Sequence, residues 1–342
     1  MNERISTLSH LILPLLEWFR DNQRTLPWRS DPTPYHVWVS EIMLQQTRVA
    51  AVLGYYRRFM EALPTVADLA QVEEDQLLKL WQGLGYYNRA RNLQKAARQI
   101  MEQFGGQFPR SYPDLLSLAG VGDYTAGAIA SIAFGLPEPA VDGNVLRVVT
   151  RITGDPSDIS QAATKKVIRA ALAEVIPLQA PGDFNQALME LGALVCLPNG
   201  APDCAHCPAH GFCAAHLTGK TAQIPVKGAK KPRKIEERTV YLLFHCGQVA
   251  LRRRPAKGLL AGLWEFPNEV VGSAESAGWG LDLPQAEVCG AGRHIFTHRE
   301  WHMTGKQLFL TNETLPEGWV WADEKAFCET YAVPNAFSAF LP

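Results

Sequence analysis

The chain has 342 residues, of which 47% are hydrophobic and 20% charged, and its formal net charge is −1. This length is typical of two domains, and the ordinary composition excludes a low-complexity or short-period repeat protein. The N-terminus has no secretory signal pattern and no apolar run reaches the ~20 residues that span a bilayer, so we expect a cytoplasmic protein with no membrane partner.

Residues 1–222 are predicted to be almost entirely helical. Apolar residues at positions 8, 11, 12, 15, 16 and 19 repeat at the spacing of a helix that buries one face. Further helices are expected over residues 37–59, 73–81, 89–104, 124–134, 161–176 and 184–195, with Pro and Gly breaks between them. The pattern therefore indicates an all-α N-terminal domain.

The pattern changes after residue 222. Residues 226–238 carry six Lys or Arg against two Asp or Glu, and Pro225 and Pro232 lie nearby, which indicates a basic linker over 223–237. Residues 239–245 and 248–254 are rich in β-formers and predict a hairpin around Cys246-Gly247. We expect a smaller α+β domain over 238–342, in which short strands dominate.

A tight Gly120-Val121-Gly122 turn is predicted to join two short helices, because apolar residues at helical spacing lie on both sides of it. The backbone N–H groups at the start of the second helix would then point outward and bind a phosphate. Asp142 follows twenty residues after this turn. A phosphate site with a carboxylate nearby indicates an enzyme that holds a nucleic-acid backbone, and a near-neutral net charge does not exclude this, since such a face need only be locally basic.

Glu41 is a lone carboxylate in an otherwise apolar helical stretch. Burial there would raise its pKa and keep it protonated near neutral pH, whereas Asp142 beside Asn144 would be held ionised by hydrogen bonds. Two carboxylates whose pKa values are pushed apart provide the acid and the anion that glycosidic cleavage needs. From this stretch alone, an equal alternative is that Glu41 lies at the surface, where it caps a helix or forms an ion pair.

Four of the seven cysteines fall within eighteen residues, at Cys196, Cys204, Cys207 and Cys213. In a cytoplasmic protein such a cluster indicates a metal site and not disulfides. Four thiolates this close suit an iron–sulfur cluster or a structural zinc, and the spacing alone does not decide between them.

Taken together, these motifs resemble the MutY family of adenine DNA glycosylases, which belongs to the helix–hairpin–helix superfamily. The matching segments are Ser-Glu-Ile-Met-Leu-Gln-Gln-Thr at 40–47, Gly-Leu-Gly-Tyr-Tyr at 83–87, Gly-Val-Gly at 120–122, Asp-Gly-Asn at 142–144 and the four cysteines. The resemblance covers residues from about 5 to 216 and, more loosely, 238–342. It implies a multidomain protein with an all-α helix–hairpin–helix glycosylase domain over 1–222 and an α+β Nudix (MutT)-like lesion-recognition domain over 238–342. Within the first domain it implies a helical barrel lobe over about 30–137, with the terminal helices and the cluster loop over 1–29 and 138–222.

The family hydrolyses the N-glycosidic bond of adenine mispaired with 8-oxoguanine or guanine in duplex DNA, and it carries a [4Fe–4S] cluster. The resemblance therefore implies a monomeric base excision repair enzyme, associated with the nucleoid in a bacterium, whose cluster is bound by the four cysteines. It assigns proton donation to adenine N7 to Glu41 and stabilisation of the oxocarbenium-like sugar to Asp142. Tyr124 and Asn144 would orient the two carboxylates.

The same resemblance implies a set of DNA contacts spread along the chain. These are Arg29 and Gln186 at the flipped adenine, Gln45 and Tyr86 as wedges in the base stack, Thr47 and Leu84 close to them, Gly120 and Gly122 at the hairpin, and Phe296, Thr297 and His298 at the lesion. Thr297 stands where the family usually has serine, so the hydroxyl is kept.

Three other functions compete with this one. An endonuclease III-like glycosylase and AP lyase would carry a lysine nucleophile at the position of Tyr124, and a phenol cannot form a Schiff base with C1′ of the sugar. A non-catalytic iron–sulfur DNA-binding protein would not need Glu41 and Asp142 together. A Nudix hydrolase is disfavoured because the Arg-Glu-x-x-Glu-Glu run is absent.

Two departures from the family are a first cysteine gap of seven residues where six are usual, and Ala119 where the hairpin usually has proline.

Overall fold

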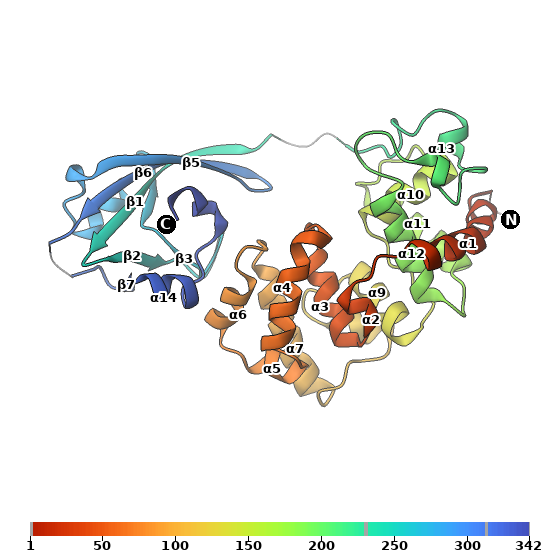
Figure 1. Cartoon of the computed structure of the whole chain (residues 1–342), viewed down its shortest axis with the longest axis horizontal. Coiled ribbons are helices and arrows are strands. Elements are labelled where there is room, and N and C mark those ends of the chain that lie inside the picture. The colour runs from red at the N-terminus through yellow and green to blue at the C-terminus, as the bar shows by residue number, and fades with distance from the viewer. Residues whose placement is uncertain (1–2, 229–231, 312–313, 342) are drawn as a thin grey trace. The chain divides into compact units, whose positions relative to one another are not determined.

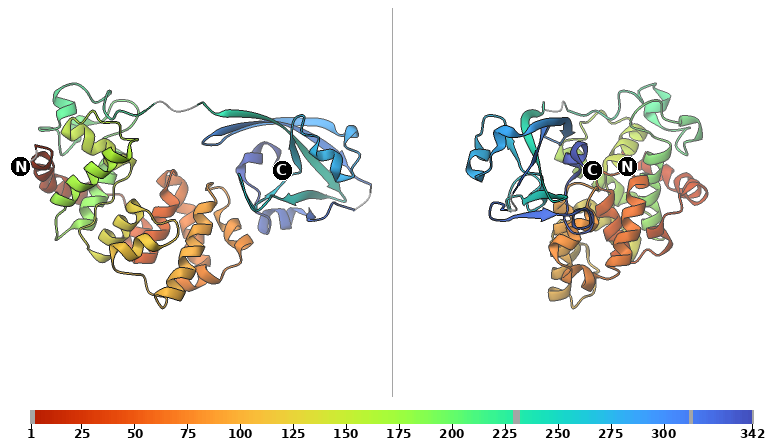
Figure 2. Two further views of the ribbon diagram at one scale, coloured as in Figure 1. Left: turned by 180° about the vertical axis from the view of Figure 1, so that it is seen from behind. Right: turned by 60° about the vertical axis from the view of Figure 1, so that its left-hand side comes forward.

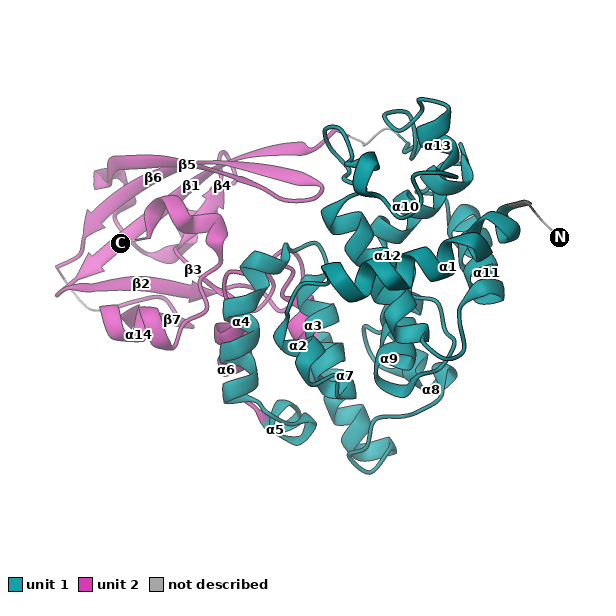
Figure 3. Cartoon of the chain, turned by 45° about the vertical axis from the view of Figure 1, so that its right-hand side comes forward, with its two compact units in different colours: residues 1–71, 92–229 teal, residues 72–91, 230–342 magenta. Residues whose placement is uncertain are grey.

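The structure is a computed structural model that describes residues 3–228, 232–311 and 314–341 (Figure 1). The chain divides into two compact units, one of residues 1–71 and 92–229 and the other of residues 72–91 and 230–342 (Figure 3). Of the predicted linker 223–237, residues 229–231 lie outside the described residues. No helix within the described ranges is long and apolar enough to cross a membrane.

The first unit is helical, as predicted. Its helices are α1 (Glu3–Asn22), α2 (Pro27–Ser30), α3 (Pro34–Leu44), α4 (Val49–Ala62), α5 (Val66–Gln71), most of α7 (Asn88–Gln103), α8 (Tyr112–Ser117), α9 (Asp123–Phe134), α10 (Gly143–Thr153), α11 (Ala162–Val175), α12 (Pro181–Leu194) and α13 (Ala214–Leu217), with a 3-10 turn η1 (Cys204–His206).

The apolar stripe of α1 is buried as its spacing predicts. Leu8, Leu11, Leu15 and Phe19 are at most 3% exposed and pack in one core with residues of α10, α11 and α12. Burying a side chain of this size contributes roughly 1.5–3 kcal/mol. This core fixes α1 against the helices that carry Asp142 and the cysteine loop.

The structure has two helices where the sequence predicts one. The predicted helix over 37–59 ends at Leu44 and a new helix begins at Val49. Gln46 has a positive φ of 59°, which a helix does not allow, so the chain leaves α3 there. The prediction of one helix was wrong because residues 45–48 have no Pro or Gly to mark the break.

The helix–turn–helix around Gly120 is confirmed, with α8 on one side and α9 on the other. Gly120 has φ +74°, and a Cβ atom there would lie 2.6 Å from the Cβ of Asn92, so the turn requires glycine. Gly122 is the N-cap of α9 and provides no side-chain cap, and a Cβ there would meet nothing within 4 Å. The first N–H groups of α9 therefore lack a side-chain partner from their N-cap.

The second unit is built on a mixed sheet. Its strands are β1 (Lys234–His245), β2 (Gln248–Arg253), β3 (Trp264–Glu265), β4 (Asn268–Val270), β5 (Glu287–Ile295), β6 (Arg299–Phe309) and β7 (Trp319–Ala322). The strand order is β3-β2-β1-β6-β5, with β4 paired to β1 and β7 paired to β2. β1 runs parallel to β6, and β5 returns antiparallel to β6. The unit also holds α6 (Glu74–Trp81), α14 (Glu324–Glu329) and the 3-10 turns η2 (Glu275–Trp279), η3 (Leu283–Gln285) and η4 (Asn335–Phe340).

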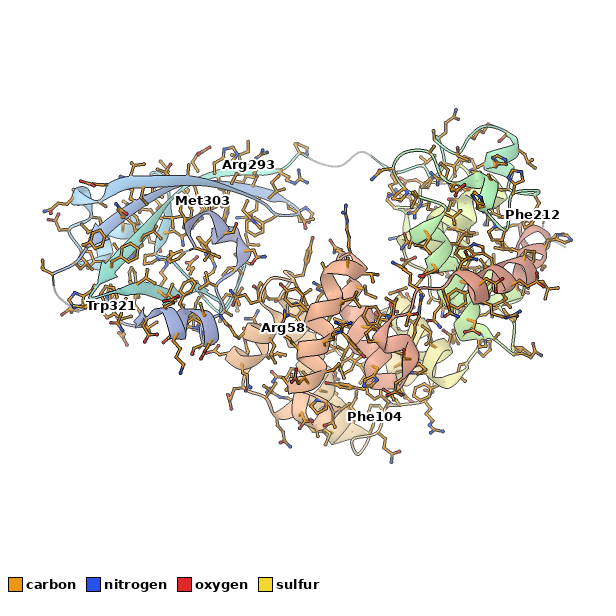
Figure 4. The ribbon with its side chains drawn as sticks, in the orientation of Figure 1. Arg58, Phe104, Phe212, Arg293, Met303 and Trp321 are labelled. Atoms are coloured by element: carbon orange, nitrogen blue, oxygen red, sulfur yellow. The ribbon has the colours of Figure 1, made fainter. Side chains whose placement is uncertain are left out.

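The predicted hairpin is the β1–β2 pair, which is registered Phe244 to Val249. Its two turn residues, Cys246 and Gly247, both have positive φ, as a two-residue turn between twisted strands requires. The sheet buries residues on both faces, with Val240, Met303 and Phe337 in one core and Tyr241 and Leu243 in the other (Figure 4 labels Met303). In the views of Figures 1 and 2, η4 lies against the curved β1–β6–β5 strands.

Candidate active site

Glu41 lies on α3, in the first unit. The helix begins with Thr33 as N-cap, whose side chain accepts a hydrogen bond from the His36 N–H, and with Pro34 in its first turn. Most of its side chains are apolar and buried, and Glu41 itself is 6% exposed. Burial raises the pKa of Glu41 to about 7, against the opposing effect of a hydrogen bond from Tyr124. The buried reading of Glu41 is therefore confirmed, and the surface alternative is wrong.

Tyr124 on α9 is the direct partner of Glu41. Its hydroxyl donates a hydrogen bond to Glu41 Oε2 and lies 3.2 Å from Met189 Sδ. Burial and the adjacent carboxylate raise the pKa of Tyr124 well above its ordinary value, so the phenol stays protonated and remains a donor. The packing of α9 on α3 holds this pair together.

Asp142 is the N-cap of α10. Its Oδ1 accepts from the Val145 N–H at 2.7 Å and its Oδ2 from Asn144 Nδ2 at 2.8 Å. Arg147 in turn donates to Asn144 Oδ1 at 2.9 Å, so the amide that orients Asp142 is itself held. Burial nevertheless raises the pKa of Asp142, and the hydrogen bonds only oppose this. The hydrogen bonds are those predicted and they lower the pKa of Asp142, but the effect of desolvation on that pKa is larger.

Glu41 and Asp142 interact electrostatically, and the interaction affects the pKa of Glu41. The charge of Asp142 raises the pKa of Glu41, and the charge of Arg29 lowers it. Ionising one carboxyl group therefore makes it harder to ionise the other, which favours one proton on the pair.

Arg29 and Gln186 are brought together, as the resemblance implied. Arg29 closes the short helix α2, and its Nε donates to Gln186 Oε1 on α12 at 3.0 Å. Their neighbour Glu190, one helical turn after Gln186, is 1% exposed and binds Arg29 Nη2 at 2.9 Å and Arg24 Nη2 at 2.8 Å. Burial alone would raise the pKa of Glu190, but the hydrogen bonds from both guanidinium groups lower it to about 2.

Arg24 and Glu190 were not predicted from the sequence. Glu190 lies four residues after Gln186, so it shares the face of α12 that bears Gln186, but no spacing in the sequence links Arg24 or Arg29 to it. Met189 contacts the Tyr124 hydroxyl, so this face of α12 reaches both the Arg29–Gln186 pair and the Tyr124–Glu41 pair.

Gln45 and Thr47 lie in the loop that separates α3 from α4. Gln45 Nε2 donates to Thr125 Oγ1 on α9 at 3.4 Å, and the Thr47 hydroxyl donates to Gln45 O at 3.3 Å. The loop starts four residues after Glu41, so α3 carries Glu41 and leads directly into Gln45, the predicted wedge.

In the second unit, the residues after α6 form a tight loop. Gly85 and Tyr86 have positive φ values of 71° and 48°, and Trp81 Nε1 donates to Gly85 O at 3.1 Å. Arg89 Nη2 donates to Leu84 O at 3.0 Å. Leu84 is buried, whereas Tyr86 is 49% exposed, so this loop presents Tyr86 to solvent.

Phe296, Thr297 and His298 form the turn between β5 and β6. The Phe296 N–H donates to Arg299 O at 2.9 Å, and β1 is fastened alongside by the Lys234 N–H, which donates to His298 O at 3.2 Å. The hydroxyl groups of Thr297 and Tyr86 lie 3.2 Å apart. Two of the sequence-predicted DNA contacts, 211 positions apart, thus meet within one unit.

All four clustered cysteines line one pocket, which Arg151, His210 and His216 also line. Arg151 Nη1 donates to Cys196 Sγ at 3.3 Å, and Arg147 Nε donates to Cys196 O at 2.8 Å. Four thiols with guanidinium groups beside them suit a metal centre whose thiolates carry net negative charge. Within the described residues, no three His, Cys, Asp or Glu side chains converge on a point where a single metal ion would sit.

Comparison with known proteins gives two family matches. Residues 39–177 match the HhH-GPD superfamily of base excision DNA repair proteins, and residues 239–342 match the NUDIX domain. The chain is 36% identical to adenine DNA glycosylase of Mus musculus, over 92% of this chain and 74% of that protein. It is 35% identical to the Homo sapiens protein of the same name, over 94% of this chain and 71% of that protein. A Buchnera aphidicola adenine DNA glycosylase is 38% identical, over 74% of this chain and 72% of its own length.

Among solved structures, the chain resembles a thermostable thymine-DNA glycosylase with a TM-score of 0.56 and 26% identity, over 64% of this chain and 98% of that one. It resembles endonuclease III trapped as a covalent intermediate with DNA with a TM-score of 0.54 and 25% identity, over 63% of this chain and 98% of that one.

Proposed function

The chain belongs to the adenine DNA glycosylase family of base excision repair, and from that premise we propose that Glu41 and Asp142 are its acid and its anion. The observation that carries this proposal is the buried pair itself. Glu41 has a pKa of about 7 and accepts a hydrogen bond from Tyr124, while Asp142 is fixed by the start of α10.

The reaction then follows from the protonation states. A protonated Glu41 donates its proton to N7 of adenine, the C1′–N9 bond breaks, and its electron pair leaves with the base. The positive charge that develops on the sugar faces the carboxylate of Asp142. Water adds at C1′ and releases one proton, which restores Glu41. Asn144 and Tyr124 keep the two carboxyl groups in place.

The flipped adenine would meet Arg29 and Gln186. In the free protein these side chains hydrogen-bond each other, so a base that enters must exchange that bond for bonds to its own edge. Glu190, held ionised by Arg24 and Arg29, keeps the Arg29 guanidinium in one orientation. Gly120 and Gly122 would bring a DNA phosphate to the start of α9.

We expect a monofunctional enzyme that leaves the DNA strand intact. The position where a lyase would have its lysine holds Tyr124, whose raised pKa and hydrogen bond to Glu41 keep it a neutral phenol. The test is single-turnover release of adenine from a duplex with 8-oxoguanine opposite. Strand breaks should appear only after alkali, and breaks without alkali would favour the lyase.

For the substrate, we propose adenine opposite 8-oxoguanine, with guanine as a poorer partner. Phe296, Thr297 and His298 would read the lesion, because Thr297 and His298 are exposed at a turn whose backbone is tied at both ends. Gln45, Thr47, Leu84 and Tyr86 would support the stack beside it. The domain bounds of 1–222 and 238–342 and the linker over 223–237 stay predictions, and strand β1 already begins at Lys234 within the predicted linker.

For the cofactor, we propose a [4Fe–4S] cluster bound by Cys196, Cys204, Cys207 and Cys213. When bound, it would hold the loop between α12 and α13 in shape for DNA contact. Arg151 beside Cys196 Sγ supports an anionic group there. Protein purified without oxygen should be brown and contain about four irons per chain. Colourless, active protein with one zinc per chain would contradict this proposal.

A further inference from the structure

We propose that Lys79 is a positioning residue that holds the Tyr86 loop against the Thr297 turn and thereby sets how well the enzyme distinguishes 8-oxoguanine from guanine. This inference rests on the proposed function of Tyr86 and Thr297. It concerns only the second unit, to which the chain contributes residues 72–91 together with the sheet (Figure 3).

The observation that carries the inference is where the Lys79 ammonium group lies. Lys79 is in the last turn of α6, and its Nζ donates to Phe327 O at 3.0 Å and to Tyr331 O at 2.9 Å. Phe327 is in the last turn of α14, where the backbone carbonyl groups receive no hydrogen bond from an N–H group of the same helix. Lys79 thus supplies to α14 the donor that the next turn would have given.

Further contacts join residues 72–91 to the rest of the second unit. Gln82 Nε2 donates to Val333 O at 2.9 Å, Arg91 Nη2 donates to Ala261 O at 2.7 Å, and Asp75 pairs with Arg253 at 2.6 Å. The Asp75–Arg253 pair is solvent-screened, since both side chains are more than 40% exposed, and such pairs stabilise little. Lys79, which is partly buried and has two acceptors, is the contact whose loss should matter most.

The loop that Lys79 anchors is stiff up to Tyr86. Trp81 donates to Gly85 O, and the Arg89 guanidinium donates to Leu84 O and lies over the Trp81 and Tyr86 rings at 5.3 and 5.6 Å. A rigid loop transmits a shift of α6 to the Tyr86 hydroxyl, which lies 3.2 Å from the Thr297 hydroxyl. A hydrogen bond of this length tolerates little displacement. Lys79 therefore acts on the lesion contact through Tyr86 and does not touch DNA.

The experiment measures single-turnover adenine excision by the full-length protein on two duplexes, with 8-oxoguanine or guanine opposite adenine. Lys79→Met removes the donors at similar length, and Lys79→Arg keeps donors. Lys95→Met, at an exposed position of α7, is the matched control. We expect Lys79→Met to lower the 8-oxoguanine to guanine rate ratio at least about fivefold. Lys79→Arg should recover most of the ratio, and Lys95→Met should stay within about twofold of the wild type.

Tyr86→Phe separates positioning from general damage. If Lys79 acts through the Tyr86–Thr297 contact, Lys79→Met combined with Tyr86→Phe should lower the ratio no further than Tyr86→Phe alone. An unchanged ratio in Lys79→Met, an equal slowing of both duplexes, or additive losses in the double variant would each overturn the inference. If Thr297→Ala lowers the ratio while Lys79→Met does not, only the inference fails. If Tyr86→Phe and Thr297→Ala both leave the ratio unchanged, the proposed roles of Tyr86 and Thr297 in lesion reading fail and the inference fails with them.

Discussion

The proposed chemistry depends on one carboxyl group that stays protonated near neutral pH. Glu41 meets this need because α3 places it among apolar side chains, and the hydroxyl that approaches it belongs to a phenol that does not ionise. Glu190, also buried, is the opposite case, because two guanidinium groups compensate its charge. Burial raises the pKa of Glu41, whereas the hydrogen bonds from Arg24 and Arg29 outweigh the effect of burial on the pKa of Glu190.

We predict that Glu41→Gln abolishes adenine excision and stabilises the protein at high pH. An amide cannot give a proton to N7, and the wild-type rate should fall as pH rises through about 7, where Glu41 ionises. Because the pKa of Glu41 is raised in the folded state, the folded protein binds the proton more tightly, so stability is lost as pH rises from about 4.5 to about 7. Above that window Glu41→Gln should gain up to about 3 kcal/mol over the wild type.

Thermal unfolding at pH 5 and pH 8 measures this, with Glu61→Gln at an exposed position as the control. If Glu41→Gln is no more stable than the wild type at pH 8, then the charge of ionised Glu41 does not destabilise the folded protein. Rapid excision by the same variant would remove Glu41 from the acid role.

We predict that Asp142→Asn slows excision by a factor of about 10²–10³ and leaves DNA binding intact. Asparagine can still accept the Val145 N–H bond that caps α10, so the change removes charge and keeps shape. Asp323→Asn is a matched control, since Asp323 caps α14 in the same way far from the proposed chemistry in sequence. Single-turnover rates and gel-shift affinities measure both, and an equal loss in the two variants would point to capping alone.

At the scale of elements, the two glycines of the α8–α9 turn do different work. Gly120 is required by its positive φ and by the nearness of Asn92. Gly122 is required by neither, because its φ is −102° and space lies around it. A glycine with free space beside an uncapped helix start is explained if another molecule approaches there.

We therefore predict that two matched substitutions affect different properties, one the stability of the protein and the other its affinity for DNA. Gly120→Ala should lower the free energy of unfolding by about 1–3 kcal/mol, through backbone strain and the clash with Asn92. Gly122→Ala should leave the melting temperature nearly unchanged and weaken DNA binding, because the new methyl group would stand where the phosphate comes. Melting curves and salt-dependent binding titrations distinguish the two. DNA affinity that survives Gly122→Ala would place the phosphate elsewhere.

Elements with regular periodicity were predictable and irregular joints were not. The α1 stripe, the β1–β2 hairpin and the Gly120 turn each have a local signal in spacing or in turn residues. The break between α3 and α4 has none, since Gln46 adopts positive φ in a stretch that contains neither Pro nor Gly. The ion cluster of Arg24, Arg29 and Glu190 joins residues 166 and 161 positions apart, so only the folded chain reveals it.

At the scale of the whole molecule, the contribution of residues 72–91 to the second unit was not predictable. Within 1–222 these residues read as one more amphipathic helix and a Gly-rich loop, yet Lys79 and Gln82 bind backbone carbonyls of residues 327–333. Every residue has a main-chain carbonyl group, so the residues that accept such hydrogen bonds cannot be recognised from the sequence. The resemblance named Tyr86 and Thr297 separately, and the structure brings their hydroxyl groups together.

This arrangement decides how lesion reading is best tested. Deleting residues 226–342 would remove the proposed lesion readers and also the partners of Lys79, Gln82 and Asp75, so lost discrimination would have two explanations. In the full chain, Phe296→Ala with His298→Ala removes two predicted readers while β1 still pairs with β6. We predict that this double variant cuts adenine opposite guanine at nearly the wild-type rate and loses most of its preference for 8-oxoguanine, at roughly 1–3 kcal/mol for each good contact removed. Thr297→Ser, which keeps the hydroxyl, should match the wild type on both duplexes. Unchanged discrimination in the double variant would leave lesion recognition to Thr297, Gln45, Thr47, Leu84 and Tyr86, because these are the remaining side chains proposed to lie beside the lesion.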